Sequence, residues 1–333
     1  MSESAGPTAR LRAGGLILAV AVTVLVAAIS LCVGARAVPL SDVLGALFDY
    51  AGTDDHVVVR DLRVPRLVLG VAVGAALAVA GALVQTLTRN PLAEPGILGV
   101  TAGASFAIIL ASAWWRLDSP VAQLVAAVVG ALAATTVVHA VGGTSPLRLV
   151  LAGTALSAVL AGLGLAIRLA LPDVFDGYRF WSVGSLAGRE QLPLGVPLAV
   201  IGVCLVAAAV LVPSLEALAL GEDVAHSLGA TVARTRTLVL LVLTVLAAAA
   251  TAIAGPIAFV GLVVPHLVRR LCAGSVGWLV AFCVVLGPLL MLAADTLSRV
   301  LLPTGELPVA VLTAFVGGPV LIWVVRRYGA AEL

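Results

Sequence analysis

Apolar residues run through this chain in long continuous blocks, unlike the periodic apolar patterns of amphipathic helices or half-buried strands. A helix needs roughly 20 apolar residues to cross about 30 Å of hydrocarbon, and ten blocks approach that length. They lie at 14–34, 65–87, 97–114, 120–141, 147–171, 192–213, 236–254, 257–270, 277–301 and 307–326. The pattern therefore predicts an all-α integral membrane protein with about ten transmembrane helices, forming a single transmembrane domain over residues 1–333.

Two blocks leave alternatives open. The block at 257–270 is short and contains Pro265, so it is either a tilted partner of the preceding span or a helix that stops inside the membrane. The first block precedes Ala35-Arg36-Ala37, which resembles a signal-peptidase site. Its apolar run is longer than a usual signal sequence, which favours an uncleaved first span over a cleaved signal.

Composition narrows the function. Hydrophobic residues make up 62% of the chain and charged residues 11%, whereas soluble domains carry about 25% charged residues. Every basic side chain is an arginine, and a phosphate-binding P-loop needs its lysine, so the chain is not a P-loop ATPase by itself. The four cysteines form no C-x-x-C pair and the four histidines are far apart. We therefore expect no catalytic site, no metal site and no bound cofactor.

An even number of spans places both termini on one side of the membrane. The pairs Arg269-Arg270 and Arg326-Arg327 lie close to span ends on that side, and arginines near span ends favour the cytoplasm. This predicts cytoplasmic termini, with residues 1–13 as a cytoplasmic tail and 214–235 as a cytoplasmic loop. The segment before the second span then lies outside.

That outer segment carries Arg60, Arg63 and Arg66. Their spacing of three places them on one helical face. Either these side chains extend toward lipid headgroups, or they form a dock for acidic side chains of an external protein; spacing alone does not separate the two. Asp295 and Arg299 are four residues apart, a spacing at which they can form an ion pair on one helix.

Two connecting segments are informative. Pro91 and Pro95 follow the second span and forbid a continuous helix there. In the long inner loop, Glu222 and Asp223 suit a helix start and Gly229 suits a helix end. This pattern favours a short amphipathic helix that docks into a partner's groove over a solvated linker.

Taken together, these segments resemble the FecCD family of ABC-importer permeases over nearly the whole chain. The residues that carry the resemblance lie mainly at 63–66, 74–77, 81–85, 89–100, 151–153, 181–186, 220–222, 228–229, 255–266, 294–295 and 306–309. The resemblance implies the type II importer architecture: ten transmembrane helices per subunit and two permease subunits, the second either a different paralogue or another copy of this chain. It also implies two ATPase subunits that use ATP-Mg and an extracytoplasmic substrate-binding protein. No nucleic-acid partner is expected.

The resemblance assigns roles by matching positions. Arg63, Arg66 and Arg299 correspond to the binding-protein dock, and Asn90 and Leu92 to a cytoplasmic gate. A second gate element precedes the fifth span, where Thr144 and Ser145 depart from the family spacing. The ATPase-coupling helix corresponds to Leu220, Gly221, Glu222, Asp223, Ala225, Leu228 and Gly229.

The substrate expected from the resemblance is a ferric siderophore, because residues 179–189 are similar to the ferric-enterobactin branch of the family. Haem and cobalamin remain alternatives. An ion-coupled secondary transporter would need intramembrane carboxylates, and Asp295 is the only clear candidate. The expected location is the bacterial cytoplasmic membrane, in which the chain would be a multi-pass protein.

Overall fold

A computed structural model of the chain describes residues 9–143, 145–179, 181–189, 192–219, 221, 231–302 and 305–328. Ten long helices within these ranges coincide with the ten predicted blocks. They are α1 (Ala9–Cys32), α4 (Val64–Thr88), α5 (Val100–Trp115), α6 (Pro120–Gly142), α7 (Pro146–Ala170), α9 (Gly195–Ala219), α11 (Val232–Ala254), α12 (Val260–Cys272), α13 (Val276–Ser298) and α14 (Val309–Tyr328). The all-helical prediction is therefore confirmed.

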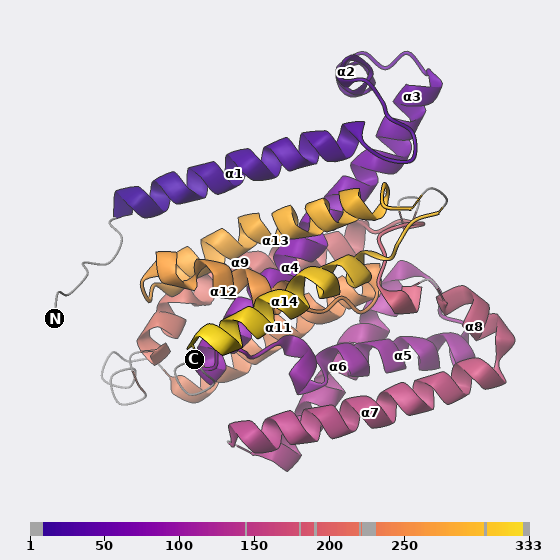
Figure 1. The fold of residues 1–333 in the computed structure, drawn as a ribbon. Helices are drawn as coiled ribbons and strands as arrows, with labels where there is room; N and C mark the ends of the chain where they lie inside the picture. The colour runs from indigo at the N-terminus through magenta and orange to yellow at the C-terminus, as the bar shows by residue number, and fades with distance from the viewer. Residues whose placement is uncertain are drawn as a thin grey trace.

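Short helices that the sequence analysis did not predict join the long ones. They are α2 (Leu40–Phe48), α3 (Asp54–Val57), α8 (Pro172–Tyr178), a π-helical turn at Val58–Arg63 and 3-10 turns at Pro95–Leu98 and Trp181–Val183. The segments α3, the π turn and α4 follow one another without a break, so α2 and α3 project beyond one end of the bundle (Figure 1). These elements fall below the length at which apolar periodicity is readable.

Seven of the described helical stretches are long and apolar enough to cross a membrane: α1, Asp54–Thr88, α6, Leu147–Ala170, α9, α11 and α13. The apolar helices α5 and Val309–Trp323 are shorter. With 13 residues, α12 is about 20 Å long and is too short to span 30 Å of hydrocarbon. Its length favours the alternative in which this helix stops inside the membrane.

Helix α4 forms the centre of the bundle. Its apolar stretch is 78% buried, and it packs against α9, α11, α12 and α13. Small residues permit these close contacts: a Cβ added at Gly81 would overlap the carbonyl oxygen of Gly261 in the residues opening α12. Arg66 lies in the first turn of α4 and Arg89 directly follows its last residue. The two ends of the bundle are called the Arg66 end and the Arg89 end below.

Helices α1 and α7 lie at the periphery, and only 11% of the apolar window of each is buried. Helix α1 runs along α13 (Figure 1), where the Thr23 hydroxyl donates a hydrogen bond to the Val285 carbonyl at 3.3 Å. Their remaining apolar surfaces are available to lipid or to another subunit.

The predicted loop 214–235 is shorter in the structure than in the sequence analysis. Helix α9 continues through Pro213 to Ala219, and α11 already begins at Val232. Membrane helices tolerate an internal proline where neighbouring groups satisfy the freed backbone, so Pro213 does not end α9. Of the seven residues assigned to coupling, only Gly221 lies within the described residues.

Candidate functional site

An ion pair between α4 and α13 lies at the Arg66 end. The Arg66 guanidinium donates from Nη2 and Nε to Asp295 Oδ1 at 2.9 and 3.0 Å, and only 1% of Asp295 is exposed. Arg66 Nη2 also lies 2.7 Å from Glu306 Oε2, in the segment before α14. One guanidinium thus links three parts of the chain through charge-assisted bonds, the strongest class of protein hydrogen bond.

Arg299 and Arg63 hold the end of α1. Arg299 Nη1 donates to the Ser30 and Val33 carbonyls at 3.1 Å each, and Nη2 donates to Ser30 Oγ at 2.6 Å. Arg63 Nη1 donates to the Leu31 carbonyl at 2.6 Å. The last carbonyls of a helix lack intrahelical partners, so these two arginines satisfy groups that would otherwise be orphaned. The predicted pairing of Asp295 with Arg299 is also confirmed, at 3.3 Å.

The structure therefore brings together the three arginines that the family resemblance assigned to docking. Arg63, Arg66 and Arg299 are only 7%, 7% and 6% exposed, and each bonds to groups of its own chain. Headgroup contact by Arg63 and Arg66 does not fit this burial, and contact with an external protein would require these bonds to open. Arg60 differs, because it is exposed and lies over the Tyr50 ring at 4.9 Å.

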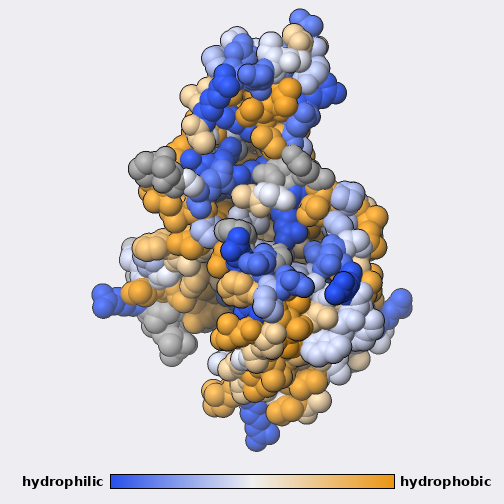
Figure 2. Space-filling model, turned by 90° about the vertical axis from the view of Figure 1, so that its right-hand side faces the viewer, coloured by the Kyte–Doolittle hydropathy of each residue, from blue (hydrophilic) through white to orange (hydrophobic). Residues whose placement is uncertain are grey.

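Hydrophilic residues gather at the centre of the Arg66 end, between apolar flanks (Figure 2). A polar cavity of about 420 Å³ at this end is lined by residues that include Arg116, Asp118, Gln123, Tyr178 and Arg189. Gln123 Nε2 donates to the Tyr178 hydroxyl at 3.2 Å. Burial raises the pKa of the Tyr178 hydroxyl, and the nearby Asp118 carboxylate adds to this rise, so the phenol stays protonated at neutral pH.

At the opposite end, a tight turn follows α4. Arg89 adopts the left-handed conformation with φ 53°, and Asn90 Oδ1 accepts a hydrogen bond from the Leu92 backbone N–H at 2.9 Å. Such a side-chain-to-backbone bond fixes a turn, as the two prolines of this segment predict. Both Asn90 and Leu92 are half-buried.

The second predicted gate element lies at the start of α7. The Ser145 carbonyl accepts from Leu149 N–H at 3.0 Å, which makes Ser145 the residue that precedes the helix; Thr144 lies outside the described residues. No hydrogen bond joins Ser145 to Asn90 or Leu92 in the described part of the chain. The α7 contact is made further along, where Gly153 lies directly against the Ile97 carbonyl.

Glu94 is a functional candidate that the sequence analysis did not single out. Its Oε1 accepts from the backbone N–H of Phe259 at 2.8 Å, and Phe259 is the left-handed residue, with φ 70°, that precedes α12. A carboxylate at a helix N-terminus interacts favourably with the positive end of the helix dipole. Glu94 therefore fixes the buried start of the short helix to the turn that follows α4. The sequence feature that could have identified Glu94 is a carboxylate placed between two apolar blocks.

A cavity of about 470 Å³ lies between α5 and α7, with Trp181 and Pro256 also in its wall. Its polar groups are the hydroxyls of Thr101, Ser105, Ser157 and Ser182 and the side chain of Arg168. The buried Ser105 Oγ has no hydrogen-bond partner within the described chain. Arginine is the single ionisable residue type among the described residues of this wall, so the cavity suits an anionic solute with apolar surfaces.

The sequence matches the FecCD transport family over residues 22–327. The chain belongs to this family. It is 46% identical over 332 residues, 98% of each chain, to the ferric enterobactin transport system permease protein FepD of Escherichia coli. It is also 35% identical over 294 residues, 87% of this chain and 88% of the relative, to the ferric enterobactin permease protein FepG of the same organism.

A solved structure supports the same conclusion. The chain is similar, with a TM-score of 0.80 and 28% identity, to a metal-chelate type ABC transporter in an inward-facing conformation, covering 94% of this chain and 99% of the other. The predicted ABC permease architecture is therefore confirmed. The chain is a multi-pass membrane protein and the transmembrane subunit of a transporter, not itself an enzyme.

Proposed function

We propose that this permease belongs to an ATP-driven importer of ferric siderophores. The observation that carries the proposal is the 46% identity, over 98% of each chain, to a ferric enterobactin permease. The cavity between α5 and α7 agrees with it, because Arg168 and four hydroxyls can meet an anionic chelate while Trp181 offers an apolar surface. Haem and cobalamin are the alternative substrates.

The permease works as one half of a pair. A different paralogue is the preferred second subunit, because both FepD and FepG of one organism are similar to this chain; a homodimer is the alternative. The weakly buried α7 supplies apolar surface for such a contact. Two ATPase subunits, which use ATP-Mg, and an extracytoplasmic binding protein complete the importer, and this chain itself binds no cofactor.

The Arg89 end faces the cytoplasm of a bacterial cell in this proposal, with both termini on that side. Support comes from Arg269 and Arg270, in the last turn of α12 at this end. A cysteine introduced at the exposed Ala273 should react with a membrane-impermeant maleimide only in broken cells, whereas one at the exposed Ala51 should react in intact cells. The unaltered chain measures the background from its own cysteines, and the opposite labelling would reverse the orientation.

The Arg66 end receives the binding protein. The hydrophilic centre of this end supports the assignment (Figure 2), and we infer that Arg63, Arg66 and Arg299 shape the docking face by holding α1, α4 and α13 together. An acidic docking residue would reach the Arg66 guanidinium only by competing with Asp295 and Glu306.

We infer that the gate and the coupling segment act at the Arg89 end. Asn90, Leu92, Thr144 and Ser145 form the gate in this proposal, and Leu220–Gly229 couples it to the ATPase. Closure of the ATPase pushes the coupling segment, and the two permeases rock between outward and inward openings. Gly221 has φ 123°, which disfavours any side chain there. Replacing Gly221 and Glu222 together should leave ATP hydrolysis intact while uptake falls.

A secondary transporter driven by ions is a weaker candidate. Its coupling carboxylate would be Asp295, but that group lies against both Arg66 and Arg299. That carboxylate is already paired with two cationic side chains of its own chain, so a coupling cation would have to displace them.

Uptake of radiolabelled ferric siderophore into a strain that lacks this gene tests the substrate. Restoration by the wild-type chain, together with its partner subunits, is expected for the siderophore and not for haem or cobalamin. Uptake that persists after the ATPase subunit is removed would contradict the ATP-driven mechanism, while restoration with cobalamin alone would reject only the substrate.

A further inference from the structure

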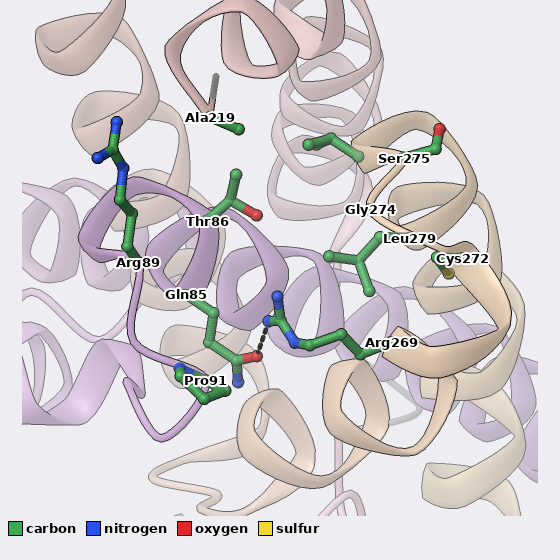
Figure 3. A pocket seen from close by; sticks show the side chains of 11 residues that line it. Gln85, Thr86, Arg89, Pro91, Ala219, Arg269, Cys272, Gly274, Ser275 and Leu279 are labelled. Carbon is green, nitrogen blue, oxygen red and sulfur yellow. Dashed lines mark hydrogen bonds between the residues drawn. The ribbon is translucent and has the colours of Figure 1, made fainter. Parts of the chain in front are cut away.

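A cavity of about 260 Å³ opens at the Arg89 end, between the ends of α4, α9, α12 and α13 (Figure 3). Its wall contains Gln85, Thr86, Arg89, Pro91, Ala219, Arg269, Cys272, Gly274, Ser275, Val276 and Leu279. The volume is several times the roughly 30 Å³ that one water molecule takes up in the liquid. The cavity can therefore admit a tetrahedral phosphate group with part of what it is attached to.

Two guanidiniums dominate the polar wall. Arg269 Nη2 donates to Gln85 Oε1 at 2.6 Å (Figure 3), while the buried Arg269 Nε has no hydrogen-bond partner in the described part of the chain. Arg89 Nη2 donates to the Leu218 carbonyl at 2.9 Å. A guanidinium carries five N–H donors, so both side chains retain donors for a ligand. Arg269 is half-buried and Arg89 is exposed, so the positive charge of both side chains is open to a ligand in the cavity.

Glu216 contacts the cavity wall through Ser275, and its carboxylate is already bound there. Glu216 Oε1 accepts from Ser275 Oγ at 3.0 Å and from the Gly277 backbone N–H at 3.2 Å, so it caps the start of α13. The positive end of the α13 dipole is therefore occupied and adds little to the site. None of the described residues in the cavity wall is Asp or Glu, which leaves the two arginines without a neutralising group in that wall.

The place of the cavity, at the end of α4, favours phosphate over a free carboxylate as its ligand. Helix α4 has 25 residues and is about 37 Å long, longer than the roughly 30 Å hydrocarbon core. Helix α4 therefore extends beyond the hydrocarbon core, which puts Arg89, directly after its last residue, within reach of lipid headgroups. Basic pockets between membrane helices at this level bind anionic headgroups, and the planar fork of arginine matches phosphate oxygens. We propose that Arg269 and Arg89 bind a phosphate-bearing anion in this cavity.

Two arms of one experiment distinguish the sources of that phosphate. The full chain is purified and placed in nanodiscs of phosphatidylcholine alone or with phosphatidylglycerol, and native mass spectrometry counts retained lipids. In a second arm, inorganic phosphate is titrated in phosphatidylcholine nanodiscs while thermal unfolding is followed. Retained phosphatidylglycerol identifies a lipid headgroup, and a phosphate-dependent rise in melting temperature identifies the free anion; either result supports the site.

The variants are Arg269→Gln, Arg269→Lys and Arg89→Gln, with Arg148→Gln as the matched control, because Arg148 is exposed at the start of α7 and is not part of the cavity wall. Loss of one charged hydrogen bond should weaken binding roughly tenfold or more. Arg269→Lys keeps the charge and covers the case in which Arg269→Gln fails to fold. Equal ligand retention by the wall variants and the control would overturn the proposal. So would binding that appears only after Glu222→Gln and Asp223→Asn, since the chain's own carboxylates would then fill the site.

Discussion

Arg66 on α4 and Asp295 on α13 form a buried ion pair, with 2.9 Å between Nη2 and Oδ1, although 229 residues separate them in sequence. The same carboxylate lies 3.3 Å from Arg299 Nε, whose guanidinium holds the end of α1. Three helices that the chain makes at very different times are thus joined through one carboxylate. The ion pair therefore stabilises the contact between these helices, and we propose that it affects docking by holding them in place.

Replacing Asp295 by asparagine should destabilise the protein severely. The substitution keeps the size of the side chain but leaves the buried Arg299 without its carboxylate and Arg66 with Glu306 alone. Breaking a buried pair in this way costs about 3–5 kcal/mol. Thermal unfolding in detergent measures the loss. Asp173→Asn, at an exposed position of α8, is the control and should melt like the wild type. An Asp295→Asn protein with an unchanged melting temperature would mean that the pair contributes nothing.

Charge reversal separates direct docking from structural support at the Arg66 end. Arg66→Glu places a second carboxylate beside Asp295 and Glu306, so we expect less folded protein as well as less uptake. Arg60→Glu alters an exposed side chain, and its melting temperature should stay unchanged. Binding of the purified binding protein to each variant in nanodiscs provides the readout. Normal folding and normal uptake in Arg66→Glu would contradict both roles of Arg66.

A larger residue at Gly81 should separate α4 from α12. A Cβ at this position overlaps the Gly261 carbonyl, and forcing extra atoms into a packed contact costs about 1–3 kcal/mol or more. Gly81→Val is compared with Gly162→Val on α7, where a Cβ meets nothing within 4 Å. Both substitutions add the same helix-propensity effect, so the difference between their melting temperatures reports packing alone. Equal melting temperatures would argue that the backbone shifts at no cost.

Removing the Glu94 carboxylate should loosen the start of α12. Glu94→Ala leaves the half-buried Phe259 N–H without its acceptor, at a cost of about 1–3 kcal/mol, while Glu94→Gln keeps an oxygen that can accept. We expect faster proteolysis and lower uptake for the alanine variant, with the glutamine variant close to wild type. If both variants behaved alike, the negative charge and not the hydrogen bond would be the important property of Glu94.

The sequence predicts the helices well because membrane spans are a property of local composition. All ten apolar blocks became helices, and the paired prolines after α4 end that helix where expected. The spacing of Asp295 and Arg299 was also sufficient to predict their ion pair, since the two residues are one helical turn apart. Local patterns fail where the partner is remote: nothing near Arg66 in sequence points to Asp295, and nothing near Glu94 points to Phe259. Pro213 misleads for the opposite reason, because its neighbours in space permit α9 to continue.

The attachment of α1 has a consequence for biosynthesis. Ser30 leaves the ribosome 269 residues before Arg299, which bonds to it, and Arg66 likewise precedes Asp295. Until the ninth long helix is inserted, Arg66 lacks its carboxylate partners Asp295 and Glu306. The first helices therefore cannot reach their final arrangement during translation. A truncated chain that ends before α13 should stay associated with the insertion machinery or be degraded.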